Sequence, residues 1–392
     1  MATLKKTLAG LAALLLAAAV WLPCLHFVFA RRASDFYQAQ ALSPQARALA
    51  NRQLRLWTEP QSREQELGKM RASNAEWDFM ARSFLVWSLA NMSLRDPGSQ
   101  PGYLQTMDQI IEETLRLEQD RGMYFFLMPY AHVRPWIMQP PRSLFLDGEI
   151  ALMLAARRLV EEKPEYQKPL TERVNLIVDR LNQSRQGLLE SYPDECWTFD
   201  HLNALVAIRM ADRLDGTDHS ALIRGWLALA KQKLVHAETG LLVSNTTMGL
   251  RALNGPEGSS IWMIAHLLQP LDPDFARDQY DRARKELGRT TLGFSYAREW
   301  PVSWESEPDI DSGPIIPVFN ISAGSSGMAF IGATAFQDEP FLSSLATTLD
   351  FAAFPTRKKG ALKYCASNQV GDAALLYATT LGPLWRKIGA NP

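Results

Sequence analysis

Residues 145–159 read FLDGEIALMLAARRL, and residues 165–186 read EYQKPLTERVNLIVDRLNQSRQ. The first stretch is apolar on nearly every side, so a helix formed by it has to be buried on every side. The second stretch places its charges on one face and its apolar residues on the other, which is typical of a helix with one face in water. Together they predict an inner helix followed by an outer helix.

The same alternation continues through the chain after residue 40, where helical periodicity dominates and strand-like alternation is scarce. Successive inner stretches begin about 59 residues apart, which is enough for two helices and two loops. We therefore predict an all-α fold, an (α/α)6 barrel that forms one domain over residues 33–392. The expected outer helices are 44–57, 103–119, 165–186, 219–234, 273–287 and 340–351, and the inner ones are 75–92, 145–160, 193–212, 256–269, 324–336 and 369–381.

The first 32 residues have a different character. Lys5 and Lys6 precede residues 7–30, which contain no Asp, Glu, Lys or Arg. Such a run is long enough to cross the ~30 Å hydrocarbon core of a bilayer, although Val28-Phe29-Ala30 resembles the end of a cleaved signal peptide. We expect a retained membrane helix, with the main domain on the extracytoplasmic side, which is the periplasm in a bacterium. A cleaved and secreted form is the alternative.

Composition argues against several classes of protein. The chain has 41 Lys and Arg against 42 Asp and Glu, with no basic block, so nucleic-acid binding has no electrostatic basis. Three cysteines without a CxxC motif provide neither a disulfide framework nor a typical zinc site. The sequence also contains no HExxH, GxSxG or nucleotide-binding glycine pattern. We expect a small-molecule substrate and no metal, cofactor or nucleic acid, and the oligomeric state stays open.

Acidic residues and glycines gather where the expected inner helices begin, as in Asp147-Gly148-Glu149, Asp194-Glu195 and Gly371-Asp372. In a barrel these ends meet at one mouth, where helix amino termini favour carboxylates and anionic ligands. An ordinary capping role for each acid is the alternative. Residues 121–142 and 288–323 are rich in proline and aromatic residues and lack a helical period, so we expect them to form walls or lids of a pocket.

One segment resembles a known family. Residues 192–203 read YPDECWTFDHLN, and they are followed by DRLDGTD at 212–218 and DPDF at 272–275. From about residue 190 to 287 this frame is similar to the linalool dehydratase/isomerase family. The resemblance implies an (α/α)6 barrel without a cofactor. In that family, cysteine, histidine, aspartate and tyrosine side chains dehydrate and isomerise a small tertiary terpene alcohol.

The resemblance also implies different residues at the catalytic positions. Glu149 stands at the family's histidine position, Ser191 and Asp200 stand at its two cysteine positions, and Cys196 stands at a tyrosine position. The family's amino-terminal aspartate and tyrosine have no identifiable counterpart here. The implied activity is that of a lyase or isomerase that acts on a largely apolar, terpenoid-like alcohol through carboxylates instead of thiols.

The residues alone support acid–base chemistry by Glu149, Asp200 and Asp311, with Glu195 as a fourth candidate. Burial and mutual repulsion raise the pKa of at least one such carboxyl, so that it can act as a general acid while another acts as the base. A base that removes a proton from carbon makes a lyase. A base that removes it from water makes a hydrolase, such as an inverting glycoside hydrolase, which is the first alternative.

A non-catalytic, membrane-anchored binding protein is the second alternative. It predicts that Arg134, Arg251 or Arg298 neutralises the carboxylates. The residues that we expect to contact the substrate are Tyr192, Cys196, Trp136, His132, Asn245 and Tyr296.

Overall fold

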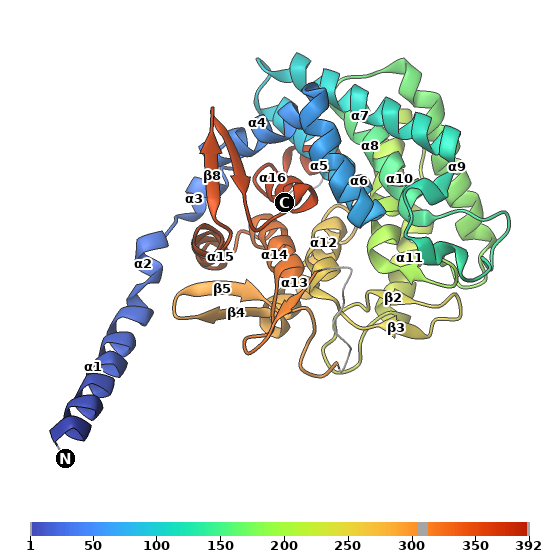
Figure 1. Ribbon diagram of the computed structural model, residues 1–392. Helices are drawn as coiled ribbons and strands as arrows, with labels where there is room; N and C mark the ends of the chain where they lie inside the picture. The colour runs from blue at the N-terminus through green and yellow to red at the C-terminus, as the bar shows by residue number, and fades with distance from the viewer. Residues whose placement is uncertain (1, 305–312, 390–392) are drawn as a thin grey trace.

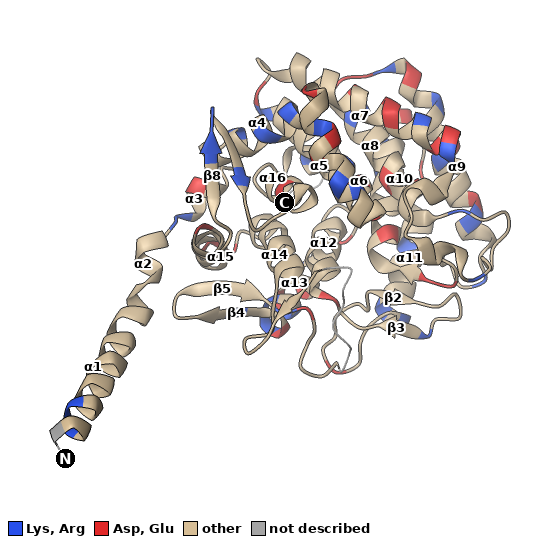
Figure 2. Ribbon diagram, viewed as in Figure 1, with Lys and Arg blue, Asp and Glu red and all other residues tan. Residues whose placement is uncertain are grey.

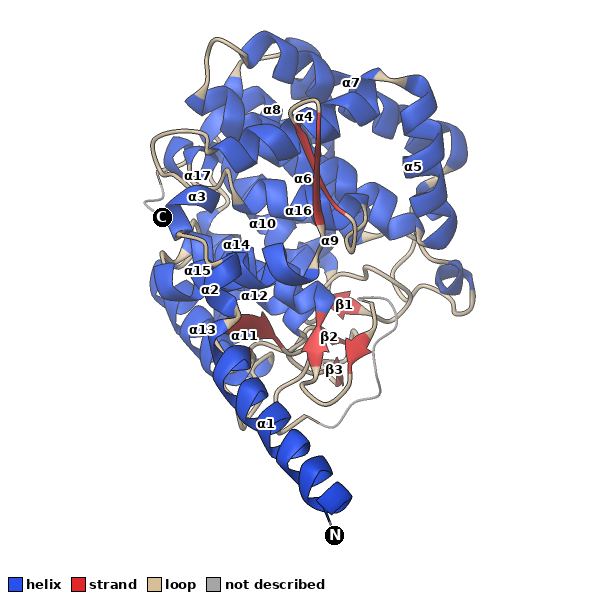
Figure 3. Ribbon diagram, turned by 60° about the vertical axis from the view of Figure 1, so that its left-hand side comes forward, coloured by secondary structure: helices blue, strands red, loops and turns tan. Residues whose placement is uncertain are grey.

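The computed structural model describes residues 2–304 and 313–389, and most of these residues are helical (Figures 1 and 3). Each inner helix contacts the next one along the chain, and the sixth contacts the first, so the ring is closed. The (α/α)6 barrel is therefore confirmed. The inner helices are α6 (Ala75–Arg95), α8 (Leu144–Val160), α10 (Thr198–Asp215), α12 (Gly258–Leu268), α14 (Ala323–Ala335) and α16 (Gln369–Ala378).

The outer helices alternate with the inner ones along the chain, as the periodicity predicts. Figure 2 shows that the outer helices α7 and α9 carry many charged side chains, whereas much of the inner ring is uncharged. Every residue of α8 from Leu144 to Leu159 is buried, as expected for a helix that is apolar on all sides. The outer helices are α4 (Pro44–Thr58), α7 (Gln100–Arg121), α9 (Gln167–Gln183), α11 (Ser220–Lys233), α13 (Pro273–Glu286) and α15 (Glu339–Ala352).

Helix α5 (Pro60–Ser73) is an addition that the sequence pattern did not indicate. Its stretch, PQSREQELGKMRAS, is polar nearly all round and buries only Leu67 and Met70. A helix with so little apolar surface gives no clear periodic signal. Short helical segments complete the set: α17 (Pro383–Lys387), η1 (Met123–Phe125), η2 (Pro129–His132) and η3 (Pro164–Tyr166).

Short antiparallel strands lie in the connections that lead into inner helices. None is longer than four residues, so they were not visible as strands in the sequence. One sheet has the order β1-β2-β3, a second β4-β5-β7-β6, and β8 pairs with β9. The strands are β1 (Cys196–Trp197), β2 (Asn245–Thr246), β3 (Ala252–Asn254), β4 (Gly288–Thr291), β5 (Phe294–Ala297), β6 (Ile315–Ile316), β7 (Ile321–Ser322), β8 (Pro355–Lys358) and β9 (Ala361–Tyr364).

The amino-terminal segment extends away from the barrel (Figure 1). It contains α1 (Ala2–Cys24), followed by the short helices α2 (His26–Phe29) and α3 (Ala33–Phe36). The helical span Thr3–Phe36 contains a window of mean hydropathy 2.3 that is not buried at all. By length and composition it is able to cross a membrane, and a signal sequence has the same properties.

Candidate active site

Three acidic side chains come together where α6, α8 and α10 begin. Glu76 lies in the first turn of α6, Asp200 lies in the first turn of α10, and Glu149 lies near the start of α8. Glu149 is only 1% exposed and Asp200 only 4%, whereas Glu76 is half-buried. The three are close enough for the charge of Glu76 to act on both of the others.

Gly148 makes this arrangement possible. A Cβ atom at Gly148 would lie 3.2 Å from the backbone nitrogen of Ala204 and 3.2 Å from the carbonyl oxygen of Asp200. Helices α8 and α10 therefore pack closely at Gly148, and a side chain there would require the backbone of α10 to move by a few tenths of an ångström. The crossing places Glu149, which is the next residue, beside the first turn of α10.

Burial controls the protonation of Glu149. Loss of water raises the pKa of its carboxyl well above the ordinary value, and the charges of Asp200 and Glu76 act in the same direction. The Ser83 hydroxyl donates a hydrogen bond of 2.5 Å to Oε2 of Glu149 and lowers the pKa in part. The net effect is a carboxyl group that keeps its proton to a higher pH than an ordinary glutamate does.

Asp200 behaves in a similar way. Burial raises its pKa most, the Ser191 side chain lowers it in part, and the charge of Glu76 raises it as well. The resulting pKa of Asp200 is about 8. Glu149 and Asp200 are therefore two proton donors at the same end of the barrel. Within residues 2–304 and 313–389, no lysine or arginine forms an ion pair with either of them.

Tyr192 connects this cluster to the aromatic segment 121–142. Its hydroxyl donates a hydrogen bond to Oε1 of Glu76 and accepts one of 3.0 Å from the backbone N–H of Met128. Its ring stacks on Tyr130, with the ring centres 4.5 Å apart. The segment thus covers the loop that carries Ser191 and Tyr192, which agrees with its expected place beside the mouth.

The carboxylate of Glu190 joins the segment 121–142 to the loop that carries Ser191 and Tyr192 through backbone hydrogen bonds. It is fully buried and accepts hydrogen bonds from the backbone N–H groups of Ile137, Met138 and Asp194, at 2.8–2.9 Å. Such a carboxylate is fully occupied in holding backbone. Glu190 is therefore a positioning group for its neighbours Ser191 and Tyr192, and not a candidate acid.

His201 follows Asp200 in sequence but has a structural role. One of its ring nitrogens, Nε2, accepts a hydrogen bond of 2.9 Å from the backbone N–H of Leu189, so Nδ1 is left to donate to the carbonyl of Trp197 at 2.7 Å. Burial lowers its pKa to about 4, so the ring is neutral. Both ring nitrogens are used by the backbone.

Cys196 is buried at the start of the β1 strand. Its sulfur lies 3.2 Å from the sulfur of Met248, and burial raises the pKa of the thiol. Cys365 is exposed, and the two cysteines are not bonded to one another. Cys196 therefore lies close to the acids in sequence without the properties of a nucleophile.

The other expected residues occupy several places. Trp136 donates a hydrogen bond of 3.0 Å to the hydroxyl of Tyr124, and His132 stacks on the same ring at 4.0 Å. Asn245 accepts from the backbone N–H of Asn254 at 2.8 Å, and the Tyr296 hydroxyl contacts Thr291 at 3.1 Å.

The half-buried Glu195 pairs through its backbone with Ser191 and Tyr192, and its charge acts on Cys196. Asp311 lies outside the described residues.

Glu76 and Ser83 are the members of the cluster that the sequence did not reveal. The side chain of Asn74 caps α6 by accepting a hydrogen bond of 3.1 Å from the Trp77 N–H, so Glu76 looks like an ordinary first-turn acid. The family resemblance does not reach this part of the chain. One signal was available: Glu76 lies in the first turn of an inner helix, as Asp200 does.

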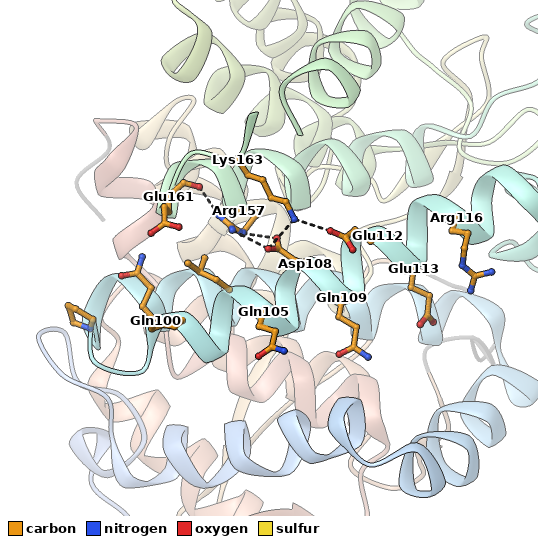
Figure 4. Close-up of a pocket in the computed structure, with 13 residues that line it drawn as sticks. Gln100, Gln105, Asp108, Gln109, Glu112, Glu113, Arg116, Arg157, Glu161 and Lys163 are labelled. Carbon is orange, nitrogen blue, oxygen red and sulfur yellow. Dashed lines mark hydrogen bonds and ion pairs between the residues drawn. The ribbon is translucent and has the colours of Figure 1, made fainter. Parts of the chain in front are cut away.

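A surface groove lies elsewhere. It has a volume of about 980 Å³ and is lined by residues of α7 and of the carboxyl-terminal end of α8 (Figure 4). Its charges are paired: Asp108 bonds Arg157 at 2.8 Å and Lys163 at 3.1 Å. Glu149 lies near the other end of α8, so this groove is not the mouth.

The arginines expected of a binding protein do not neutralise the acids. In the described part of the chain, Arg134, Arg251 and Arg298 form no ion pair with Glu149 or Asp200. No group of three or more His, Cys, Asp or Glu side chains there is arranged to hold a metal ion.

Comparison with known proteins gives no family. No family model and no curated protein matches the chain. Among solved structures, the chain is similar to a GH76 α-mannanase of Bacteroides thetaiotaomicron, with a TM-score of 0.47 and 8% identity over 77% of this chain and 85% of that one. It is also similar to a D-mannose isomerase, with a TM-score of 0.42 and 14% identity over 78% and 86% of the two chains. At these values the similarities carry no inference about the reaction.

Proposed function

We propose that this protein is a cofactor-independent enzyme that cleaves or rearranges a carbon–oxygen bond in a small molecule by general acid–base catalysis. The observation that carries the proposal is the pairing of a buried, protonated Asp200 with the half-buried Glu76 at one end of the barrel. A carboxyl group with a raised pKa can donate a proton, and a second carboxyl group beside it can accept one, so the pair is able to provide an acid and a base.

In the first candidate reaction the substrate is an alcohol. Asp200 gives its proton to the hydroxyl oxygen, the carbon–oxygen bond breaks with its electrons going to oxygen, and water leaves. Glu76 takes a proton from the neighbouring carbon, whose bonding electrons form the double bond. Tyr192 donates its hydrogen bond to Glu76 and orients that carboxylate. The charge of Asp200 raises the pKa of Glu149, so these two carboxyl groups titrate as a coupled pair.

The resemblance to linalool dehydratase/isomerase supports this candidate. Glu149, Ser191 and Asp200 stand at three of that family's catalytic positions, and in this protein Asp200 interacts with each of the other two. The aromatic rings of Phe79, Phe126 and Phe145 pack against one another close to Ser83, on the α6 side of the cluster. Such surroundings suit an apolar alcohol.

The second candidate reaction is hydrolysis of a glycosidic bond. The same two groups would serve, with Glu76 taking a proton from water and Asp200 protonating the leaving oxygen. The unequal exposure of Glu76 and Asp200 favours this use as well, because water reaches Glu76 more readily.

A substrate screen with matched variants tests the proposal. The purified full-length protein is incubated with terpene alcohols and, separately, with oligosaccharides that include α-mannosides. Products are followed by gas chromatography and by reducing-sugar release. Asp200→Asn should abolish whichever activity is found, and Glu172→Gln on the exposed face of α9 should not. An Asp200→Asn variant with full activity would overturn the mechanism.

A further inference from the structure

The amino-terminal segment joins the barrel through a fixed contact. Phe29 of α2 packs on Phe351 of α15 with ring centres 5.1 Å apart, and Phe294 of β5 packs on the same ring at 4.9 Å. Arg31 forms an ion pair with Asp350. The chain between α1 and the barrel is therefore held against α15 and the β4–β5 hairpin, and it does not act as a free tether.

Gly293 at the tip of that hairpin confirms how close this contact is. It has a φ of +82°, and a Cβ atom there would lie 2.3 Å from Cγ of His26 in α2. The tip of the β4–β5 hairpin is thus in contact with α2, which directly follows α1. Any membrane that surrounds α1 must begin within a few residues of this point, because α2 already leaves Phe27 and Val28 68% and 76% exposed.

The same side of the barrel exposes further apolar side chains. Leu292 at the hairpin tip is 49% exposed, Ile316 in β6 is 51% exposed, and Val318 and Phe319 in the turn between β6 and β7 are 90% and 50% exposed. They lie in β6 and in the two turns of the sheet of order β4-β5-β7-β6, and the ring of Phe319 lies 6.5 Å from Tyr296 of β5. We call these four residues the apolar rim. Isolated exposed apolar residues are common, but a group of them beside a membrane helix is not.

The rim lies next to the mouth of the barrel. Strand β7 runs directly into α14, so Ile316, Val318 and Phe319 lie near the amino-terminal end of an inner helix, as Glu76, Glu149 and Asp200 do. In Figure 1 the β4–β5 hairpin and the described part of the loop before α14 lie on the lower side of the barrel, the side toward which α1 projects. Residues 313–336, which include these three, contain no charged side chain, and such a stretch is suited to the surface of a bilayer.

We propose that the apolar rim rests in the surface of the lipid bilayer that holds α1, so that the mouth of the barrel opens toward the membrane. Apolar side chains of this kind reach about 5–10 Å into the boundary between headgroups and acyl chains. The contact is apolar and does not require anionic lipid. The inference concerns the surface only, and it stands whichever reaction the acids perform.

Labels on single cysteines test the proposal in the full-length protein. Cys24 and Cys365 are replaced by Ser, while Cys196 is kept because it is buried. Cysteines introduced by Leu292→Cys and Val318→Cys carry an environment-sensitive fluorophore, and the protein is placed in phosphatidylcholine nanodiscs. Asp218→Cys is the matched control, since Asp218 is exposed in the loop after α10, at the opposite end of an inner helix.

The two rim labels should show blue-shifted emission and be quenched by lipids with spin-labelled acyl chains about threefold more strongly than the control label, as expected for interfacial insertion. Rim labels that behave like the label at position 218 would overturn the proposal. A blue shift in lipid-free detergent that grows with protein concentration would also overturn it, because the rim would then be covered by a second copy of the chain.

Discussion

Asp147 and Glu149 lie two residues apart on α8, and both are buried, at 3% and 1% exposure. Their surroundings are opposite. Asp147 forms ion pairs with Arg142 and Arg173, whereas Glu149 receives a hydroxyl hydrogen bond from Ser83 and faces two more carboxyl groups. Asp147 links α8 to the segment before it and to the outer helix α9 through these ion pairs. Glu149 has no such ion pair, and its pKa is raised.

Helix α6 also carries one acid that pairs with arginines and one acid that belongs to the cluster. Asp78 bonds Arg82 at 3.1 Å and Arg71 at 3.2 Å, while Glu76, two residues earlier, joins the cluster and accepts from Tyr192. Residue type, burial and position in the first turns are nearly equal within each pair. For Asp147 and Glu149, what separates a structural acid from a candidate catalytic acid is the partner: guanidinium groups for Asp147, and a hydroxyl and other carboxyl groups for Glu149.

The largest contrast is expected between Glu149→Gln and Asp147→Asn. Glu149→Gln should reduce the turnover of a substrate found in the screen by about 100-fold or more, since Glu149 is coupled to Asp200, the proposed general acid. It should leave the free energy of unfolding unchanged or higher. Asp147→Asn should lower that free energy by about 1–3 kcal/mol, because the half-buried guanidinium groups of Arg142 and Arg173 lose one of their two carboxylates and keep only Glu118. Urea denaturation and initial rates on both variants would measure this, and equal effects on stability would contradict the comparison.

The pH dependence of stability sharpens the assignment of Asp200. Its pKa is about 8 in the folded protein, well above the ordinary aspartate value, so between about pH 4 and 8 the folded state keeps a proton that the unfolded state releases. The free energy of unfolding should fall as pH rises through this window, by up to about 1.4 kcal/mol per pH unit from this group. Asp200→Asn should remove that part of the slope and raise the melting temperature most at pH 8.5.

Activity gives an independent measure of the same group. If Asp200 is the general acid, kcat should decline above about pH 8 as its proton is lost. Glu172→Gln should retain both the wild-type stability slope and the wild-type activity profile. An Asp200→Asn slope as steep as that of the wild-type protein would assign the titration to another residue; a shallower slope is expected, because the pKa of Glu149 is raised as well.

Gly148→Ala tests the helix crossing that brings the two acids together. The added methyl group meets backbone on α10, so we expect a loss of about 1–3 kcal/mol in stability together with reduced activity. Gly225→Ala in α11 is the matched control, because nothing lies within 4 Å of its Cβ position and alanine favours helix there by about 0.5–1 kcal/mol. Thermal unfolding of both variants would decide. A harmless Gly148→Ala would show that the crossing is not tight.

The smallest expected effect concerns thiols. Cys196 is buried and its thiol keeps its proton, so blocking reagents such as N-ethylmaleimide should leave activity within about twofold of the untreated enzyme. Rates before and after treatment, with and without substrate, would measure this. Strong inactivation that substrate prevents would place Cys196 in the mechanism and weaken the role of the carboxyl groups.

The sequence predicted the barrel well because its signal is local. Each of the twelve expected helices is present, and even the short inner stretch 256–269 is matched by Gly258–Leu268. Helix α5 was missed because it buries little, and the strands were missed because each has four residues or fewer. Local periodicity therefore predicts elements that have an apolar face and says little about those without one.

The candidate site was predicted only in part, for a different reason. Glu149 and Asp200 were identified from their places at the starts of inner helices. Ser83 and Glu76 were not, because Ser83 is 66 residues from Glu149 and Glu76 is 116 residues from Tyr192. Arg82 follows Asp78 by four residues, a spacing that indicates a helical ion pair, whereas the Arg173 partner of Asp147 is 26 residues away. Those distinctions depend on tertiary contacts.

The closure of the ring by α16 against α6 affects the order in which the protein can fold. These two helices are the last and the first of the inner set, so the contact joins segments almost 300 residues apart in the chain. During synthesis, the apolar face of α6 has no final partner until α16 has been made, although helices α6 to α14 can already pack in sequence. Such long-range contacts slow folding and leave partly formed rings open to aggregation. The barrel is thus completed late, and its first inner helix, which carries Glu76, depends on its last.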